Sequence, residues 1–160
     1  MAQSSQLAAS SLVSTPSGCP PAEGTASSGL LRALARTPEG GASFPEYKAA
    51  LTAASRVIVP GLVLAEMDSF LREDRSARRL VAEVFDPTTR YEYELPLPAD
   101  LVRALELDAR FRDLAIGLVD GTVAAVAERR QVYRILTTDR RHFGAIRVGP
   151  RFTRTLDLLP

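Results

Sequence analysis

Three carboxylates occupy positions from which separate parts of the chain could bring them together. Glu66 lies in an apolar helical pattern, Asp120 lies near the start of another, and Asp139 follows a short β-branched run. If they converge, each pair repels by about 4 kcal/mol at a separation of about 4 Å and an effective dielectric constant of about 20. A hard divalent cation would offset this repulsion, and all-oxygen sites suit Mg²⁺ or Mn²⁺. The three acids therefore indicate a metal site that activates water and stabilises charge on a phosphodiester.

Two of these acids lie at the ends of neighbouring predicted elements. Residues 116–127 carry apolar side chains at helical spacing, and residues 131–136 form an apolar, β-branched run typical of a strand. This pattern places Asp120 in the first turn of a helix and Asp139 at the carboxyl end of a strand. In an open α/β sheet, the carboxyl ends of the strands form the crevice where ligands bind. Taken singly, each aspartate could equally well cap a helix or form a turn.

The third acid, Glu66, lies on the apolar face of a helix predicted over residues 60–72. Its neighbours at helical spacing are Leu62, Val63 and Phe70. Burial of an unpaired carboxylate costs several kcal/mol, so a glutamate at such a position needs a cation, a proton or strong hydrogen-bond donors. The alternative is a residue at the edge of the apolar stripe that pairs with an arginine.

Basic residues concentrate toward the C-terminus. Residues 129–154 contain eight arginines and a single acid, Asp139, although the net charge of the whole chain is only +1. This segment is a candidate surface for phosphate groups, and Arg140 and Arg141 are placed to hold the negatively charged backbone of a phosphodiester beside Asp139. The alternative is a solvated surface with ordinary ion pairs.

Length and composition are typical of one soluble domain. The chain has 160 residues, 46% of them hydrophobic, and no apolar run approaches the ~18 residues that span a bilayer. We therefore expect no association with a membrane and a cytoplasmic location. Cys19 is the only cysteine, which excludes an intramolecular disulfide and a cysteine-based zinc site. His142 is the only histidine, and we interpret it as structural or RNA-facing rather than catalytic.

Helical and strand patterns alternate along most of the chain. The spacing predicts helices over 45–54, 60–72, 76–85, 98–113 and 116–130, and strands over 56–59, 91–95, 131–136 and 145–148. In the helix over 98–113, Leu101, Leu105 and Ala109 form one apolar stripe. The alternation implies an α/β fold with a mostly parallel sheet covered on both faces. The absence of G-x-G-x-x-G and Walker A patterns argues against a nucleotide-binding domain.

The N-terminal segment has a different composition. Residues 1–26 are rich in Ser, Ala, Pro and Gly, and Glu23 is their only acid. Such a segment has little apolar surface to offset the entropy of ordering, so we expect a disordered leader, with the domain over residues 27–160. It lacks the positive start and the continuous apolar stretch of a secretory signal.

Three segments, read in order, resemble the PIN-domain toxins of VapC type: VPGLVLAEMDSFL, IGLVDGTVAAVAERR and ILTTDRRHF. The resemblance extends over about residues 28–160. It implies a three-layer α/β/α domain that binds Mg²⁺ or Mn²⁺ through an acidic cluster, cleaves RNA, is blocked by a cognate VapB-like antitoxin, and can form a homodimer. By position, Glu66, Asp120 and Asp139 match the acids of that family, and Thr138 is the hydroxyl residue beside Asp139.

The resemblance breaks at its N-terminal end. The family begins with an apolar strand that ends in an aspartate followed by small hydroxyl residues, whereas this chain has Ala26 before Ser27 and Ser28. Residues 20–25, PPAEGT, are unsuited to a central strand because prolines remove donors from the ladder. We therefore expect the sheet to lack its middle strand. A shifted reading frame or a misplaced start would explain the break, and upstream DNA that encodes no apolar strand with an aspartate in any frame would refute that explanation.

Two functions follow from these observations. One is a Mg²⁺-dependent endoribonuclease, the toxic component of a type II toxin–antitoxin pair. The other is a catalytically impaired homologue that binds an antitoxin or RNA without cleaving. The missing aspartate favours the second function, whereas the three remaining acids favour descent from the first. We expect the chain as written to be a weak nuclease at best.

Overall fold

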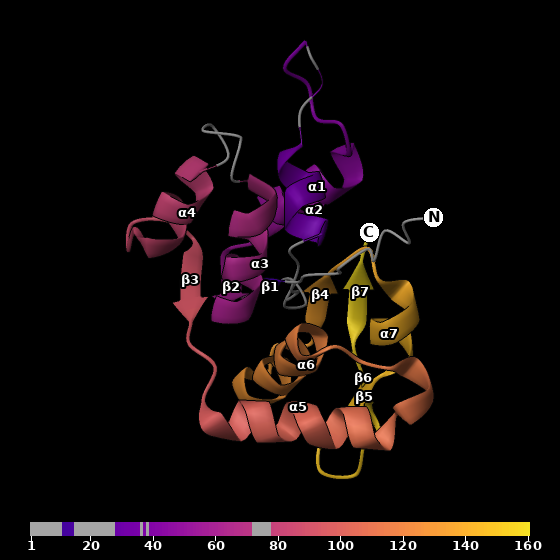
Figure 1. Ribbon diagram of the computed structural model, residues 1–160. Coiled ribbons are helices and arrows are strands. Elements are labelled where there is room, and N and C mark those ends of the chain that lie inside the picture. The colour runs from indigo at the N-terminus through magenta and orange to yellow at the C-terminus, as the bar shows by residue number, and fades with distance from the viewer. Residues whose placement is uncertain (1–10, 15–27, 36, 38, 72–77) are drawn as a thin grey trace, which may run out of the picture.

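The computed structural model describes residues 11–14, 28–35, 37, 39–71 and 78–160 (Figure 1). One sheet has five strands in the order β3-β2-β1-β4-β7. The strands are β1 (Ser11–Ser14), β2 (Arg56–Pro60), β3 (Tyr91–Glu94), β4 (Arg134–Leu136) and β7 (Asp157–Leu159). β2 pairs in parallel with β3, β4 pairs in parallel with β7, and β1 is antiparallel to both β2 and β4. Within this sheet all strands except β1 therefore point the same way, which confirms a mixed α/β fold with a mostly parallel sheet.

The sheet has a middle strand, so the expectation that it would lack one was wrong. β1, of sequence SLVS, lies between β2 and β4, with Leu12 paired to Ile58 on one side and to Ile135 on the other. Backbone groups of two inner strands need partners, and the Leu-Val pair of this segment is suited to supplying them. The remainder of the predicted leader, including Ala26 and residues 20–25, lies outside the described residues. The boundary at residue 27 stays a prediction, except that β1 belongs to the sheet.

Seven helices and a two-stranded sheet complete the described part of the chain. The helices are α1 (Ser28–Leu34), α2 (Pro45–Ala53), α3 (Gly61–Leu71), α4 (Arg78–Phe85), α5 (Pro98–Arg110), α6 (Leu118–Arg130) and α7 (Arg140–Ala145). A 3₁₀ turn (Arg112–Leu114) follows α5, and β5 (Arg147–Val148) pairs with β6 (Arg154–Thr155). The sequence did not predict α7, β6 or β7, which have six residues or fewer and show no clear period.

Local sequence explains where the long helices begin and end. Pro45 and Pro98 occupy the first turns of α2 and α5, where proline loses no helical hydrogen bond. α6 begins after Gly117 and ends at Gln131, which has a left-handed backbone (φ 55°) and donates its N–H to the carbonyls of Ala127 and Glu128. Such a cap satisfies carbonyls that the helix itself leaves free.

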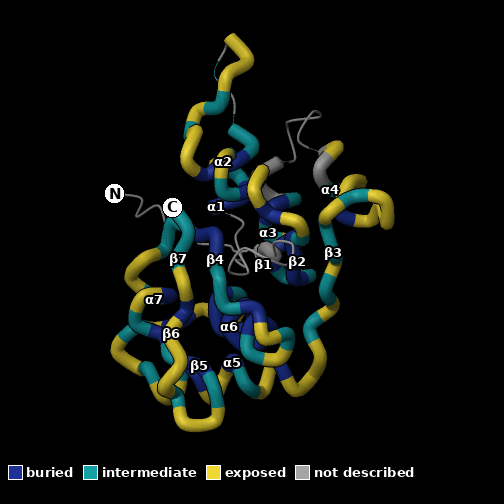
Figure 2. Tube along the Cα trace, turned by 180° about the vertical axis from the view of Figure 1, so that it is seen from behind, coloured by how far each residue is buried: buried dark blue, intermediate teal, exposed yellow. Residues whose placement is uncertain are grey.

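α6 is the buried helix of the fold. Every residue from Gly121 to Ala127 is buried, and α6 contacts α3, α5, α7, β2 and β5. In Figure 2 the middle of this helix is dark blue, as are most of β2 and part of β4. The core includes the fully buried side chains of Ile58, Ile135 and Phe143. Because α6 packs against several other elements, the position of Asp120 in its first turn is fixed.

The apolar stripe predicted on α5 is not its buried face. Leu101 and Leu105 are exposed, and α5 instead buries Asp100, Ala104 and Leu107. α5 and α6 lie side by side (Figure 1) and touch through small residues: a Cβ atom added at Gly121 would lie 3.0 Å from the Cβ of Ala104. The helical period correctly identified a regular apolar stripe on α5. The face of α5 that is buried is instead the one whose backbone approaches α6 closely.

An ion-pair network fixes the far end of α6. Arg129 lies 2.9 Å from the buried carboxylate of Asp100 and 2.7 Å from that of Glu94. Arg130 pairs with Glu94 and, at 2.6 Å, with Glu92. Two of the eight arginines expected to form a phosphate-binding surface thus bind acids of α5 and β3 instead.

We expect Gly121→Val to lower the free energy of unfolding by about 2 kcal/mol, because the branched side chain must push Ala104 away. Gly117→Ser is the matched control four residues earlier. A Cβ atom at Gly117 meets nothing within 4 Å, and serine is a better helix N-cap than glycine by a few tenths of a kcal/mol. Urea unfolding followed by circular dichroism measures both. Equal stability of the two variants would contradict the close helix contact.

Candidate metal site

Asp120 enters the site from the first turn of α6. The residue is 6% exposed, and its Oδ1 atom has no hydrogen-bond partner among the described residues. The N-cap Gly117 carries no side chain that could cap this helix start. A buried carboxylate oxygen without a donor is costly, so this atom needs a proton or a cation.

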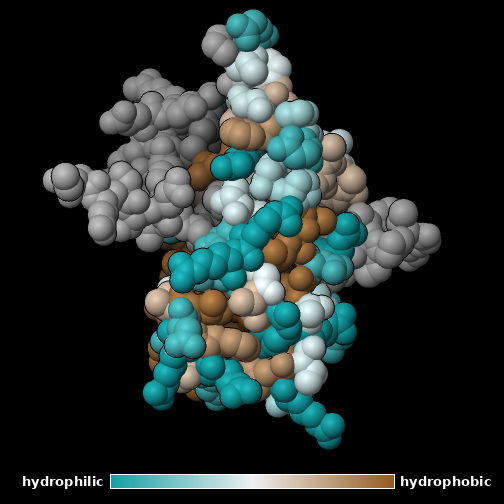
Figure 3. Space-filling model, turned by 90° about the vertical axis from the view of Figure 1, so that its right-hand side faces the viewer, coloured by the Kyte–Doolittle hydropathy of each residue, from teal (hydrophilic) through white to brown (hydrophobic). Residues whose placement is uncertain are grey.

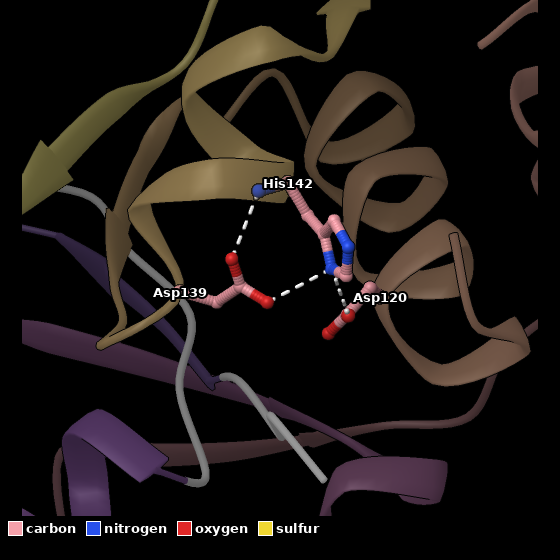
Figure 4. Close-up of side chains that lie close together, drawn as sticks. All are labelled: Asp120, Asp139 and His142. Carbon is pink, nitrogen blue, oxygen red and sulfur yellow. Dashed lines mark hydrogen bonds and ion pairs between the residues drawn. The ribbon is translucent and has the colours of Figure 1, made fainter. Parts of the chain in front are cut away.

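Asp139 enters from the loop between β4 and α7. Its N–H donates to the Oγ1 atom of the buried Thr137 at 3.0 Å, and its own Oδ1 atom accepts the N–H of His142 at 2.8 Å. Asp139 therefore acts as the N-cap of α7. Because these two bonds fix the backbone and Oδ1, the other oxygen, Oδ2, is left facing Asp120 and the ring of His142 (Figure 4).

His142 completes the cluster. Its Nδ1 atom lies 2.8 Å from Oδ2 of Asp139 and 3.5 Å from Oδ2 of Asp120. One ligand atom from each of the three residues lies within 4.8 Å of the other two, and the described ranges contain no second group of this kind. From the sequence, we interpreted His142 as structural or RNA-facing and did not expect it to join the acids. In the structure it lies in one group with Asp120 and Asp139.

Burial and two neighbouring acids raise the proton affinity of Asp120. Burial, the carboxylate of Asp139 and the carboxylate of Glu66, in that order, raise the pKa of Asp120 from 3.8 to about 8. Burial also raises the pKa of Glu66. Burial disfavours the charged form, and like charges add to this effect. A divalent cation would reverse the balance by stabilising the ionised carboxylates, and oxygen donors of this kind fit such an ion.

The resemblance predicts four residues at the catalytic site: Glu66, Asp120, Thr138 and Asp139. The structure brings Asp120 and Asp139 together. Glu66, on α3, is partly buried and close enough to act on the charge of Asp120, but it lies outside the three-residue group, so its role as a ligand stays a prediction. Thr138 precedes Asp139, and its carbonyl accepts the N–H of Arg140 at 3.1 Å; its catalytic role also stays a prediction.

Sequence reasoning missed two residues that shape the site. Thr137 supplies the hydroxyl that holds the N–H of Asp139, and His142 supplies a ring nitrogen. The signal for His142 was its spacing, since a residue three positions after a helix N-cap lies over that cap. It was overlooked because α7 was not predicted.

Arg140 and Arg141 are exposed on the first turn of α7, next to Asp139. Other arginines of the C-terminal segment have different partners: Arg147 donates to two backbone carbonyls, and the guanidinium of Arg154 lies 3.6 Å from the ring centroid of Tyr133. The face that carries α7 and β7 is mixed, with hydrophilic side chains (teal) crossing hydrophobic surface (brown) in Figure 3. The basic surface near the site is therefore narrower than the count of arginines suggested.

Comparison with known proteins agrees with this geometry. The model of the PIN domain family matches residues 30–148. Ribonuclease VapC26 of Mycobacterium tuberculosis is 39% identical over 57 residues, a stretch that covers 34% of this chain and 42% of that protein. The matched stretch is thus less than half the length of this relative. Among the described residues, no helix is long and apolar enough to cross a membrane.

The raised pKa of Asp120 predicts how stability depends on pH in the metal-free protein. Its folded pKa, about 8, exceeds the ordinary value of 3.8, so the folded state holds a proton that the unfolded state releases. This contribution is complete below pH ~4 and is lost as the pH rises to about 8, with a slope of up to about 1.4 kcal/mol per pH unit. Urea unfolding across this range should show a steeper decline for the unmodified chain than for Asp120→Asn. Parallel curves would contradict the shift.

Proposed function

The chain belongs to the PIN domain family, and on this basis we propose that it is a metal-dependent endoribonuclease, the toxin of a type II toxin–antitoxin pair of VapBC kind. One observation carries the proposal: Asp120 and Asp139 lie in one group inside the segment that matches the family, and a buried oxygen of Asp120 has no hydrogen-bond partner among the described residues. The short match to a protein named a ribonuclease supports the choice of RNA as substrate.

In this proposal, Asp120 and Asp139 hold Mg²⁺ or Mn²⁺, and Glu66 adds negative charge from α3. The bound ion would activate a water molecule and stabilise charge on the phosphodiester during hydrolysis. Asp139 keeps its orientation because Thr137 and the N–H of His142 hold it on both sides. Arg140 and Arg141 bind the RNA backbone next to the site, as their charge and exposure suit phosphate groups.

The proposed partners follow from the same relationship. RNA is the substrate, a VapB-like antitoxin blocks the site, the chain can form a homodimer, and the compartment is the cytoplasm. A toxin of this kind is held inactive by the antitoxin, so the two should bind as a stable pair. Co-expression with the product of an adjacent antitoxin gene, if the genome has one, would show this pair directly.

A second function, that of an impaired homologue that binds without cleaving, is favoured by the direction of β1. Because β1 is antiparallel, its first residue, Ser11, pairs with Leu136 at the carboxyl end of β4, which leads toward the site. The chain has no acid before Glu23. The middle strand therefore brings no carboxylate to this edge of the sheet, whereas the family carries an aspartate at the end of its first strand.

Cleavage of RNA in Mg²⁺ or Mn²⁺ by the purified chain tests both functions. We expect weak cleavage that disappears in Asp120→Asn, and only partial recovery in Ala26→Asp, since the sequence PPAEGT before that position is unsuited to a strand that would support the new aspartate. Each ~1.4 kcal/mol of metal-binding energy lost weakens binding about tenfold. A chain with an apolar strand plus aspartate restored upstream should recover most activity.

The possible results of that assay separate the two functions. Robust cleavage by the unmodified chain that is lost in Asp120→Asn would show that three acids suffice and that the impaired function is wrong. Undiminished cleavage by Asp120→Asn would contradict the role of Asp120 as a metal ligand, and no cleavage even with the restored strand would refute the nuclease proposal.

The basic pair on α7 predicts the salt dependence of RNA binding. In an Asp120→Asn background that cannot cleave, Arg140→Ala with Arg141→Ala should weaken binding of a single-stranded RNA and reduce the slope of log K against log salt by about 1.4, roughly 0.7 per phosphate contact. Arg79→Ala is the control, because Arg79 is exposed on α4, away from α7 in Figures 1 and 2. Fluorescence anisotropy measures the slope. An equal effect of the control would show that the pair is not a specific contact.

A further inference from the structure

His142 contributes the only nitrogen atom to a group that is otherwise made of carboxylates. It is also the only histidine in the chain. Its Nδ1 atom is buried and lies 2.8 Å from Oδ2 of Asp139, but the two atoms are not aligned as a hydrogen bond, and Nδ1 has no such partner among the described residues.

Two buried atoms at the centre of the cluster therefore lack hydrogen bonds. They are Nδ1 of His142 and Oδ1 of Asp120, and they come from different helices, α7 and α6. A buried polar atom in this condition needs a ligand to offset its lost hydration. The backbone N–H of His142 donates a hydrogen bond to Asp139, which fixes the backbone of His142. From there the imidazole ring points toward Asp120 (Figure 4).

The separations suit neighbouring ligands of one ion. Two donors bound at right angles about 2.1 Å from an ion lie about 3.0 Å apart. The distances from Nδ1 to the two carboxylate oxygens, 2.8 and 3.5 Å, lie on either side of that value.

We propose that His142 binds the metal directly through Nδ1, so that the centre has two carboxylates and one imidazole and prefers Mn²⁺, or another first-row transition ion, to Mg²⁺. This inference rests on the proposed function, because it deepens the same metal site. Carboxylate and water ligands suit both Mg²⁺ and Mn²⁺, whereas an imidazole nitrogen favours a first-row transition ion over Mg²⁺. The sequence segment DRRHF then contributes two ligands, Asp139 and His142, from one turn of chain.

The competing arrangement has no metal–nitrogen bond. In it, a protonated imidazole lies between the carboxylates of Asp120 and Asp139 as an ion-pair partner and takes the place of a cation. Direct binding requires Nδ1 to be free of a proton, since metal ligands bind through a lone pair. The two arrangements differ in whether the ring nitrogen touches the metal, which spectroscopy detects directly.

The deciding experiment is pulsed electron paramagnetic resonance of Mn²⁺ bound to the chain, produced without a polyhistidine tag. An imidazole nitrogen bound to Mn²⁺ modulates the electron spin echo at ¹⁴N frequencies. Because the chain has one histidine, labelling with ¹⁵N-histidine changes only His142. We expect the ¹⁴N modulation to be replaced by a ¹⁵N signal. The label leaves the fold untouched, so this result does not depend on whether a variant folds.

Binding measurements with variants extend the test. Titration calorimetry should show that His142→Asn weakens Mn²⁺ binding at least about tenfold, since even the loss of an outer partner of a ligand costs roughly 10–100-fold. His142→Asp, which restores an oxygen donor, should reduce the ratio of Mn²⁺ to Mg²⁺ affinity. Circular dichroism of the metal-free variants checks that they are folded.

Each outcome decides the proposal. Mn²⁺ binding that depends on Asp120 but shows no change with ¹⁵N-histidine would overturn the role of His142 and leave the proposed metal-dependent function standing. Failure of Asp120-dependent Mn²⁺ binding altogether would overturn both. A ¹⁵N signal together with a lower Mn²⁺ to Mg²⁺ ratio in His142→Asp would establish the imidazole ligand.

Discussion

The burial of the Asp120 carboxylate is the constraint on which the site depends. Its charge is disfavoured by its surroundings and by two other acids, and one of its oxygens has no hydrogen-bond donor among the described residues. A folded chain tolerates this cost only if other contacts hold α6 in place. The contact of Gly121 with Ala104 and the pairing of Arg129 and Arg130 with acids of α5 and β3 supply that support at the two ends of the helix. The ion pairs at the end of α6 therefore help to hold Asp120 in its buried position, although they lie several helical turns away from it.

Different parts of the site are held with different firmness. Asp120 belongs to a helix that is buried along most of its length, whereas Asp139 and His142 belong to a six-residue helix and the loop before it. Within that loop, the hydrogen bonds of Thr137 and Asp139 replace the support that a longer element would give. The side of the site formed by α6 is thus set by packing, and the side formed by α7 by local polar contacts. Orientation of ligands through such outer contacts is general in metal sites.

Much of the architecture could be predicted from the sequence because long, periodic segments dominate it. The runs RVIV and QVYRIL, and the prolines that open α2 and α5, lead directly to observed elements. Asp120 and Asp139 could be predicted because each stands at an element end. His142 could not, since its place depends on a helix too short to show a period. The buried face of α5 could not either, because a stripe of leucines predicts burial while Ala104 and Gly121 decide the contact. β1 was missed because composition identified its segment as a leader.

The segment SLVS has the same order of polar and apolar residues from either end. A strand of this kind carries almost no information about its own direction. Reversed, it would still present N–H and C=O groups to β2 and β4, as a parallel strand whose pairing is slightly less stable per residue. The middle strand can therefore have two separate roles. It completes the hydrogen bonding at the centre of the sheet, and it can carry an acid to the edge of the sheet where the site lies. A chain of this family could lose the second role and keep the first, so an intact sheet is no measure of an intact nuclease.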